Sequence, residues 1–160
     1  RSEKAYVAAF GTDVGPVTYS KRTPILTIAQ KVQKADTKGM STNAHRCIEW
    51  MMQNNIVPDR VILLSDMQCW CDSYGYSGST RNLADAWQKF TKQGGKETWL
   101  HSVHLNGYGD TPVHPDQGRI NLVSGFSEKI INMMLQTEGV VGEDGELVAL
   151  PTIDQIRAKW

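Results

Sequence analysis

Short apolar runs alternate along this chain with longer segments in which apolar residues recur every three or four positions. The runs at 6–10, 99–105 and 120–123 are each followed by glycine or polar residues and predict strands. The run Val61–Leu64 is uniformly apolar, which is typical of a strand covered on both faces. We therefore expect Val61–Leu64 to be an interior strand of a parallel sheet. A weaker pattern at 17–19 is compatible with an edge strand.

The segments 25–32, 44–52, 83–90 and 130–134 have the spacing of amphipathic helices. Strands that alternate with helices predict an α/β fold, a Rossmann-like three-layer sandwich with a mostly parallel sheet and right-handed crossovers. We expect one domain over residues 1–138. Residues 139–160 form a separate extension, predicted as a hairpin around 143–146 and a short helix from 152. The side chains expected to be buried are Cys47, Ile48, Met51, Trp87, Ile130 and Ile131.

Composition narrows the class of function. Lysine plus arginine and aspartate plus glutamate number 17 each, so the formal net charge is zero. This balance argues against a chain whose main task is to bind a phosphate backbone, since such binding needs clustered positive charge. Three cysteines do not make a disulfide framework, and no apolar run approaches the roughly 18 residues of a membrane span. We expect a soluble protein of a reducing compartment, the cytoplasm.

Candidate chemistry lies where predicted strands end. Ligands of doubly wound sheets gather beyond the carboxyl ends of the strands, and Asp66 follows the strongest strand. Thr42 precedes the helix at 44–52 in a neighbouring strand-to-helix region. Carboxylate and hydroxyl oxygens suit a hard cation such as Mg²⁺ or Mn²⁺. The alternative is that Thr42 only caps its helix and Asp66 only caps a turn.

The same residues resemble a known metal site. Gly39–Asn43 before a helix, followed by Arg60–Asp66, resembles two of the three segments of the metal-ion-dependent adhesion site of von Willebrand factor A domains. The resemblance implies that Thr42 and Asp66 are metal ligands. The third segment, Asp-x-Ser-x-Ser at the end of the first strand, occurs nowhere in the chain, and we expect it upstream of Arg1.

A narrower resemblance covers about residues 5–138. Tyr6–Gly11, Trp99–Leu105 and Arg119–Phe126, leading into 130–132, are similar in order and spacing to segments of the Ro autoantigen (TROVE-module) family. In that family an A domain sits beside a ring of helical repeats, and the ring binds small noncoding RNAs. The resemblance implies a Ro-like ribonucleoprotein whose RNA-binding ring is absent from this chain.

The absent first strand has physical consequences in this fold, where it lies at the middle of the sheet. Two strand edges would be left unpaired, so we expect the chain alone to be poorly soluble or aggregated. The metal site within this chain would be empty or weak. A complete site would leave an open position for an acidic group of a protein partner.

Other functions remain open at this stage. An A-type protein–protein adhesion domain of an unrelated multidomain protein is the main alternative. We expect no enzyme and no catalytic residues, since no glycine-rich phosphate loop follows a strand. Cys69 and Cys71 lack the spacing of a zinc site, and His101 and His104 are predicted on opposite sides of a strand. Aromatic residues at 70, 74 and 76 either stack on bases or pack onto their own domain.

Overall fold

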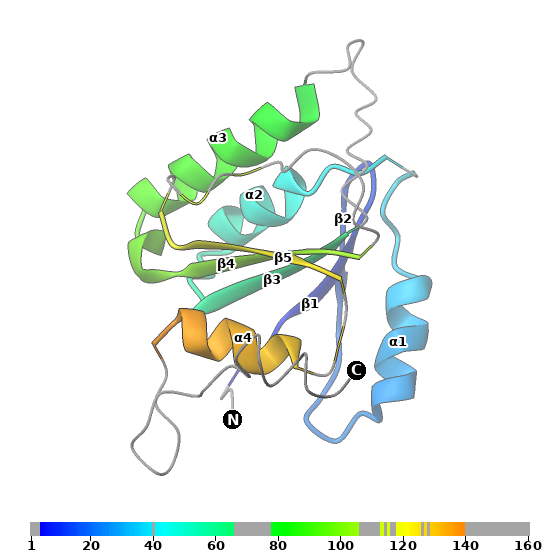
Figure 1. The fold of residues 1–160 in the computed structure, drawn as a ribbon. Coiled ribbons are helices and arrows are strands. Elements are labelled where there is room, and N and C mark those ends of the chain that lie inside the picture. The colour runs from blue at the N-terminus through cyan, green and yellow to red at the C-terminus, as the bar shows by residue number, and fades with distance from the viewer. Residues whose placement is uncertain are drawn as a thin grey trace.

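The computed structural model describes residues 4–39, 41–65, 78–105, 113, 115, 118–125, 127 and 129–139, with the backbone alone for 78–82 (Figure 1). The predicted loop after Asp66 and the predicted extension at 140–160 lie outside these residues. The elements in chain order are β1 Val7–Phe10, β2 Val14–Val17, α1 Ile25–Gln33, α2 His45–Gln53, β3 Arg60–Ser65, α3 Gly78–Lys92, a short 3₁₀ turn Gly95–Glu97, β4 Trp99–His104, β5 Ile120–Ser124 and α4 Ile130–Thr137.

The strands form two separate sheets. β3, β4 and β5 make a parallel sheet in that order, while β1 and β2 form an antiparallel hairpin. The α/β class and the parallel sheet are therefore confirmed. The edge strand expected at 17–19 lies earlier, at Val14–Val17, because it pairs with β1 through the tight turn after Phe10.

Helices cover both faces of the parallel sheet. α2 and α3 lie on one face and α4 on the other, while α1 lies beside the β1–β2 hairpin (Figure 1). The larger core joins α2 and α3 to the sheet and includes the packed rings of Trp87 and Phe90, whose centroids are 5.3 Å apart. A smaller core beneath α4 consists of Val103, Val123, Ile130 and Met134.

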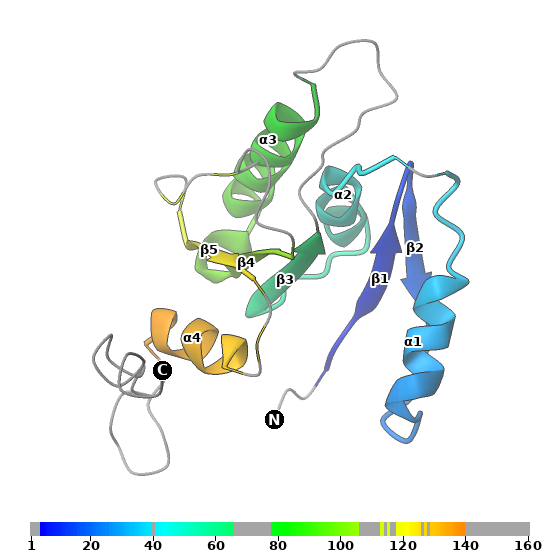
Figure 2. The ribbon, with the colours of Figure 1, turned by 45° about the vertical axis from the view of Figure 1, so that its right-hand side comes forward.

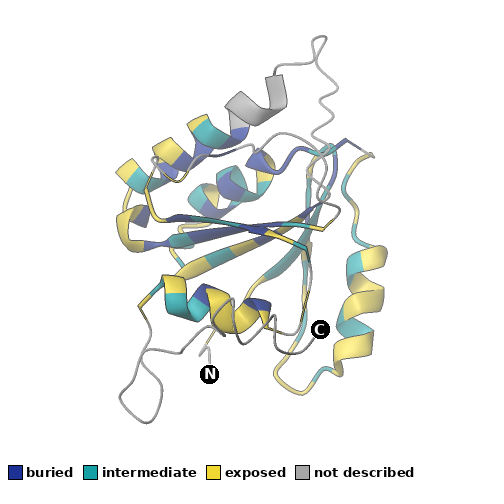
Figure 3. Cartoon of the chain, in the orientation of Figure 1, coloured by how far each residue is buried: buried dark blue, intermediate teal, exposed yellow. Residues whose placement is uncertain are grey.

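Burial agrees with most of the predicted core (Figure 3). Of the six predicted residues, Ile48, Met51, Trp87 and Ile130 are buried. Cys47 is only half-buried, although the surrounding protein raises the pKa of its thiol to about 12. The prediction for Ile131 was wrong, since its side chain is 51% exposed. It points about 100° away from Ile130 around the helix, so only Ile130 reaches the sheet.

The expectation that Val61–Leu64 is an interior strand is also wrong for the strands described. β3 lies at the edge of the three-stranded sheet, and Ile62 and Leu64 are 44% and 49% exposed. Their side chains lie on the face that α4 covers, but the buried side chains of α4 pack against Val103 of β4 and Val123 of β5. Among the described residues, the apolar run of β3 therefore has one exposed face and one edge without a partner strand.

The unpaired edge of β3 can be assigned from its hydrogen bonds. Trp99 N donates to Asp59 O and Leu105 N donates to Ser65 O, both at 2.9 Å, so the backbone of odd-numbered residues faces β4. Backbone N–H and C=O groups alternate from side to side along a strand. Those of Arg60, Ile62 and Leu64 therefore face away from β4, at the other edge of β3.

The hairpin has a corresponding edge on β1. Ala8 lies opposite Pro16, which has no N–H, so this pair is not hydrogen-bonded. The bond from Gly11 N to Asp13 O, 2.9 Å long, fits the same alternation. Ala8 and Phe10 thus direct their backbone groups away from β2. Figure 2 shows β1 and β3 side by side with their arrows pointing the same way, so the two unpaired edges face each other.

Candidate metal centre

Thr42 lies in a loop that is hydrogen-bonded to the residues directly after β1. The neighbouring Asn43 donates from its backbone N to Gly11 O at 3.0 Å and from Nδ2 to Thr12 O at 3.1 Å. Asn43 and Ser41 are buried, whereas Thr42 is partly exposed. The loop therefore holds the Thr42 position at the edge of the sheet where β1 ends. Gly11 and Asn43 were not predicted to belong to the site. The sequence feature that points to them is the glycine directly after the apolar run at 6–10.

Gly11 makes this close approach possible. A Cβ built on Gly11 would lie 2.3 Å from Gly39 O and 2.6 Å from Thr37 Oγ1. Gly39 itself has a φ of 148°, and a Cβ there would lie 2.4 Å from Thr12 Oγ1. Two glycines thus let the loop pack directly onto the end of β1.

Gly11→Ala is expected to destabilise the protein by about 1–3 kcal/mol, because backbone must move to admit the new methyl group. The midpoint of urea unfolding measures this change. A variant as stable as the wild type would show that the loop is not fastened to β1 at this point.

Thr42 is not the cap of α2. The residue at the N-cap position is Ala44, which has no side chain able to cap, and no side-chain cap hydrogen bond is present. Among the described residues, the Thr42 hydroxyl donates or accepts no hydrogen bond with the first turn of α2. The interpretation of Thr42 as a simple helix cap is therefore wrong, and its hydroxyl remains a candidate ligand.

The carboxyl end of β3 is fixed by its pairing with β4. Ser65 is buried, lies opposite His104 in the register, and accepts the bond from Leu105 N. Asp66 follows directly but lies outside the described residues. β1 and β3 point the same way (Figures 1 and 2), so the Thr42 loop and the end of β3 lie at the same edge of the fold.

The donor atoms at this edge fit a hard cation only in part. The described oxygen-bearing side chains of the two segments are the hydroxyls of Ser41, Thr42 and Ser65 and the amide of Asn43, all of which are neutral. No group of three or more His, Cys, Asp or Glu side chains able to hold a metal occurs within the described ranges. Because Mg²⁺ gives up its hydration shell reluctantly, hydroxyls alone do not suffice. A centre here needs the Asp66 carboxylate and further acidic or hydroxyl groups.

A buried histidine stands close to the candidate centre in sequence. His45, the first residue of α2, is 8% exposed, and its Nδ1 has no hydrogen-bond partner among the described residues. Burial lowers the pKa of His45, an effect that Glu49 opposes. Burial therefore favours the neutral form of the ring.

Comparisons with known proteins bear on the fold. No protein-family model matches the sequence, and a search of curated proteins gave no match. Among solved structures, the crystal structure of the *Deinococcus radiodurans* RO (RSR) protein matches with a TM-score of 0.63. The chain is similar in fold to part of a Ro protein. The match covers 85% of this chain and 26% of the *Deinococcus* protein at 17% sequence identity, so this chain spans about a quarter of that protein's length.

The structure also bears on membranes. No helix in the described part of the chain is long and apolar enough to cross a bilayer.

Proposed function

We propose that this chain is the larger part of a von Willebrand A-type domain in a Ro-like, cytoplasmic ribonucleoprotein. The observation that carries the proposal is the position of the two unpaired strand edges. In the fold expected from the sequence, the first strand lies between the strands that correspond to β1 and β3. The structural likeness to part of a Ro protein supports the same assignment.

A parallel strand supplied from outside the described residues would join the two sheets. It would pair with the backbone of Ala8 and Phe10 on one side and of Ile62 and Leu64 on the other. Such a strand satisfies backbone groups on both edges and covers apolar side chains next to β3. The order β2-β1-strand-β3-β4-β5 would then form one mostly parallel sheet.

We further propose a divalent-cation site at the carboxyl edge of that sheet. Thr42 and Asp66 would hold Mg²⁺ or Mn²⁺ together with an upstream Asp-x-Ser-x-Ser segment. Carboxylate and hydroxyl oxygens are the ligands that these hard cations prefer. The open coordination position would take an acidic group from a protein partner.

RNA binding belongs, in this proposal, to a helical-repeat ring outside residues 1–160. The zero net charge of the chain supports this division, because phosphate contacts require an excess of lysine and arginine. Small noncoding RNA should therefore copurify with the complete protein. It should also remain bound after residues 1–160 are deleted, whereas residues 1–160 alone should bind no RNA at 150 mM salt. RNA sequencing of the purified material and an electrophoretic mobility assay provide the two measurements.

The same experiment separates the proposal from its alternative, an A-type adhesion domain of an unrelated multidomain protein. A complete protein that retains no RNA, but binds an acidic protein ligand in a Mg²⁺-dependent manner, would favour the adhesion domain. Binding of RNA by residues 1–160 themselves would contradict both.

A further inference from the structure

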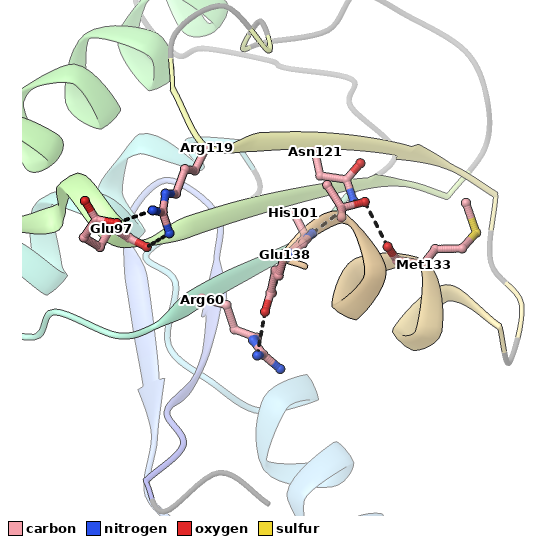
Figure 4. Close-up of polar contacts among 8 residues, drawn as sticks. Arg60, Glu97, His101, Arg119, Asn121, Met133 and Glu138 are labelled. Atoms are coloured by element: carbon pink, nitrogen blue, oxygen red, sulfur yellow. Dashed lines mark hydrogen bonds and ion pairs between the residues drawn. The ribbon is translucent and has the colours of Figure 1, made fainter. Parts of the chain in front are cut away.

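A buried polar cluster connects the carboxyl end of α4 to strands β3 and β4 of the parallel sheet (Figure 4). His101 on β4 is fully buried, and its Nε2 lies 2.7 Å from Glu138 Oε1 just beyond α4. The second carboxylate oxygen of Glu138 accepts a bond of 2.6 Å from Arg60 on β3. The Glu138 side chain is only 6% exposed. One carboxylate therefore links a helix end to two strands.

The direction of the hydrogen bonds fixes the protonation state of His101. The Thr137 hydroxyl donates to Met133 O at 2.9 Å, so it accepts from Asn121 Nδ2 at 3.2 Å. The same amide nitrogen lies 3.2 Å from His101 Nδ1, which must then be an acceptor. The ring consequently carries its proton on Nε2 and donates it to Glu138. In this neutral form each of the hydrogen bonds that link Thr137, Asn121, His101 and Glu138 has one donor and one acceptor.

A second proton on His101 would disturb the cluster in two ways. It would set the Nδ1–H group against the Asn121 amide hydrogens, donor against donor. It would also add an unbalanced positive charge, since Arg60 and Glu138 already neutralise each other. Burial accordingly lowers the pKa of His101, outweighing Glu138, which raises it.

Within the described residues, few charged groups act on the His101 ring. Trp99 on β4 stacks on the ring with centroids 6.0 Å apart, and the Arg119 guanidinium lies over the Trp99 ring, 5.8 Å from its centroid. Among the described residues, the charged groups that act on His101 are Glu138 and Arg60, and β5 contributes the uncharged Asn121.

Within the described residues, α4 contributes two buried side chains to the core. It is an eight-residue helix, and Ile130 and Met134 pack with Val103 and Val123. A helix this short is not stable without packing. Among the described residues, the polar cluster at its carboxyl end is thus a major part of its attachment.

We propose that the cluster of His101, Asn121, Glu138 and Arg60 is a pH-sensitive lock that holds α4 on the sheet at neutral pH and releases it on acidification. Because the pKa of His101 is lower in the docked state, docking is fully favoured above the ordinary histidine value of 6.5 and weakens as the pH falls below it.

Amide hydrogen exchange of the full 160-residue chain, corrected for intrinsic rates, tests the lock. Between pH 7.5 and 5.5 the opening constant of α4 should rise, by about tenfold at most, the limit reached when the undocked histidine binds a proton that the docked one fully excludes. α3, on the other face of the sheet, should change far less. An α4 opening constant that does not vary with pH, or equal losses in α3 and α4, would overturn the proposal.

The Asn121→Asp variant is expected to reverse the pH dependence of α4 docking, because aspartate has nearly the shape of asparagine but places an acceptor beside His101 Nδ1. The new carboxylate accepts from a protonated ring, and His101⁺ then balances the added charge. Protection of α4 should therefore rise on acidification in this variant. Arg119→Gln, which removes the nearby Arg119–Glu97 ion pair without touching His101, should retain the wild-type pH dependence.

The protonation state itself provides a measurement that does not depend on how a variant folds. A long-range ¹H–¹⁵N correlation spectrum of the wild type at pH 7.5 should show His101 with the proton on Nε2 and none on Nδ1. A proton on Nδ1 at this pH would contradict the proposal, whatever the variants do.

Discussion

Extending the chain upstream, so that it carries an apolar strand ending in Asp-x-Ser-x-Ser, is expected to give a monomer with one cooperative unfolding transition, whereas residues 1–160 alone are expected to self-associate. The added strand would pair with both unpaired edges and shield Ile62 and Leu64. Each large apolar side chain that becomes buried contributes about 1.5–3 kcal/mol, so the gain in unfolding free energy should reach about 3 kcal/mol or more. Sedimentation velocity and urea unfolding measure the two effects.

A proline placed at the centre of the added strand is the matched control. It removes a backbone donor between β1 and β3 and should cancel most of the gain, because proline is not tolerated in a central strand. A monomeric, cooperatively unfolding 1–160 chain would contradict the view that a central strand is absent from it.

The second large effect concerns the metal. In the upstream-extended polypeptide, Mg²⁺ or Mn²⁺ should bind with measurable heat, and Asp66→Ala should abolish that binding because it removes the negatively charged ligand. Residues 1–160 alone should bind weakly or not at all, since no group of three or more His, Cys, Asp or Glu side chains able to hold a metal occurs among their described residues. Isothermal titration calorimetry compares the three proteins.

Asp59→Asn is a control next to the same strand, β3. Asp59 lies just before β3, at the end opposite the candidate centre, so its loss should leave the affinity for metal unchanged. Thr42→Ala should weaken binding less than Asp66→Ala, because a neutral ligand is lost. Equal affinity of the Asp66→Ala variant and its parent would exclude Asp66 from the site.

The positions of helices and strands were predicted better than the burial of their side chains. The run Val61–Leu64 predicted β3 correctly, because four consecutive aliphatic residues are typical of a strand. It also suggested cover on both faces, whereas the structure leaves Ile62 and Leu64 exposed. The pattern reflects the environment expected in a complete sheet, which the described residues alone do not provide.

Contacts between residues distant in sequence were beyond prediction. Glu138 lies 37 residues from His101 and 78 from Arg60, and nothing in local periodicity links them. The bonds from Asn43 to Gly11 and Thr12 are equally non-local. Thr42 was predicted as a candidate ligand from its place before a helix, but only the position of Ala44 at the N-cap removed the alternative that it caps α2.

Amide hydrogen exchange at the two facing edges tests the central claim most directly. In residues 1–160 alone, the N–H groups of Ala8, Phe10, Ile62 and Leu64 should exchange quickly, while those of Val61 and Leu63, which face β4, should be protected. In the upstream-extended polypeptide the account predicts protection of all six, by about a hundredfold or more for the four at the edges. Fast exchange at those four positions in the longer polypeptide would contradict a strand between β1 and β3.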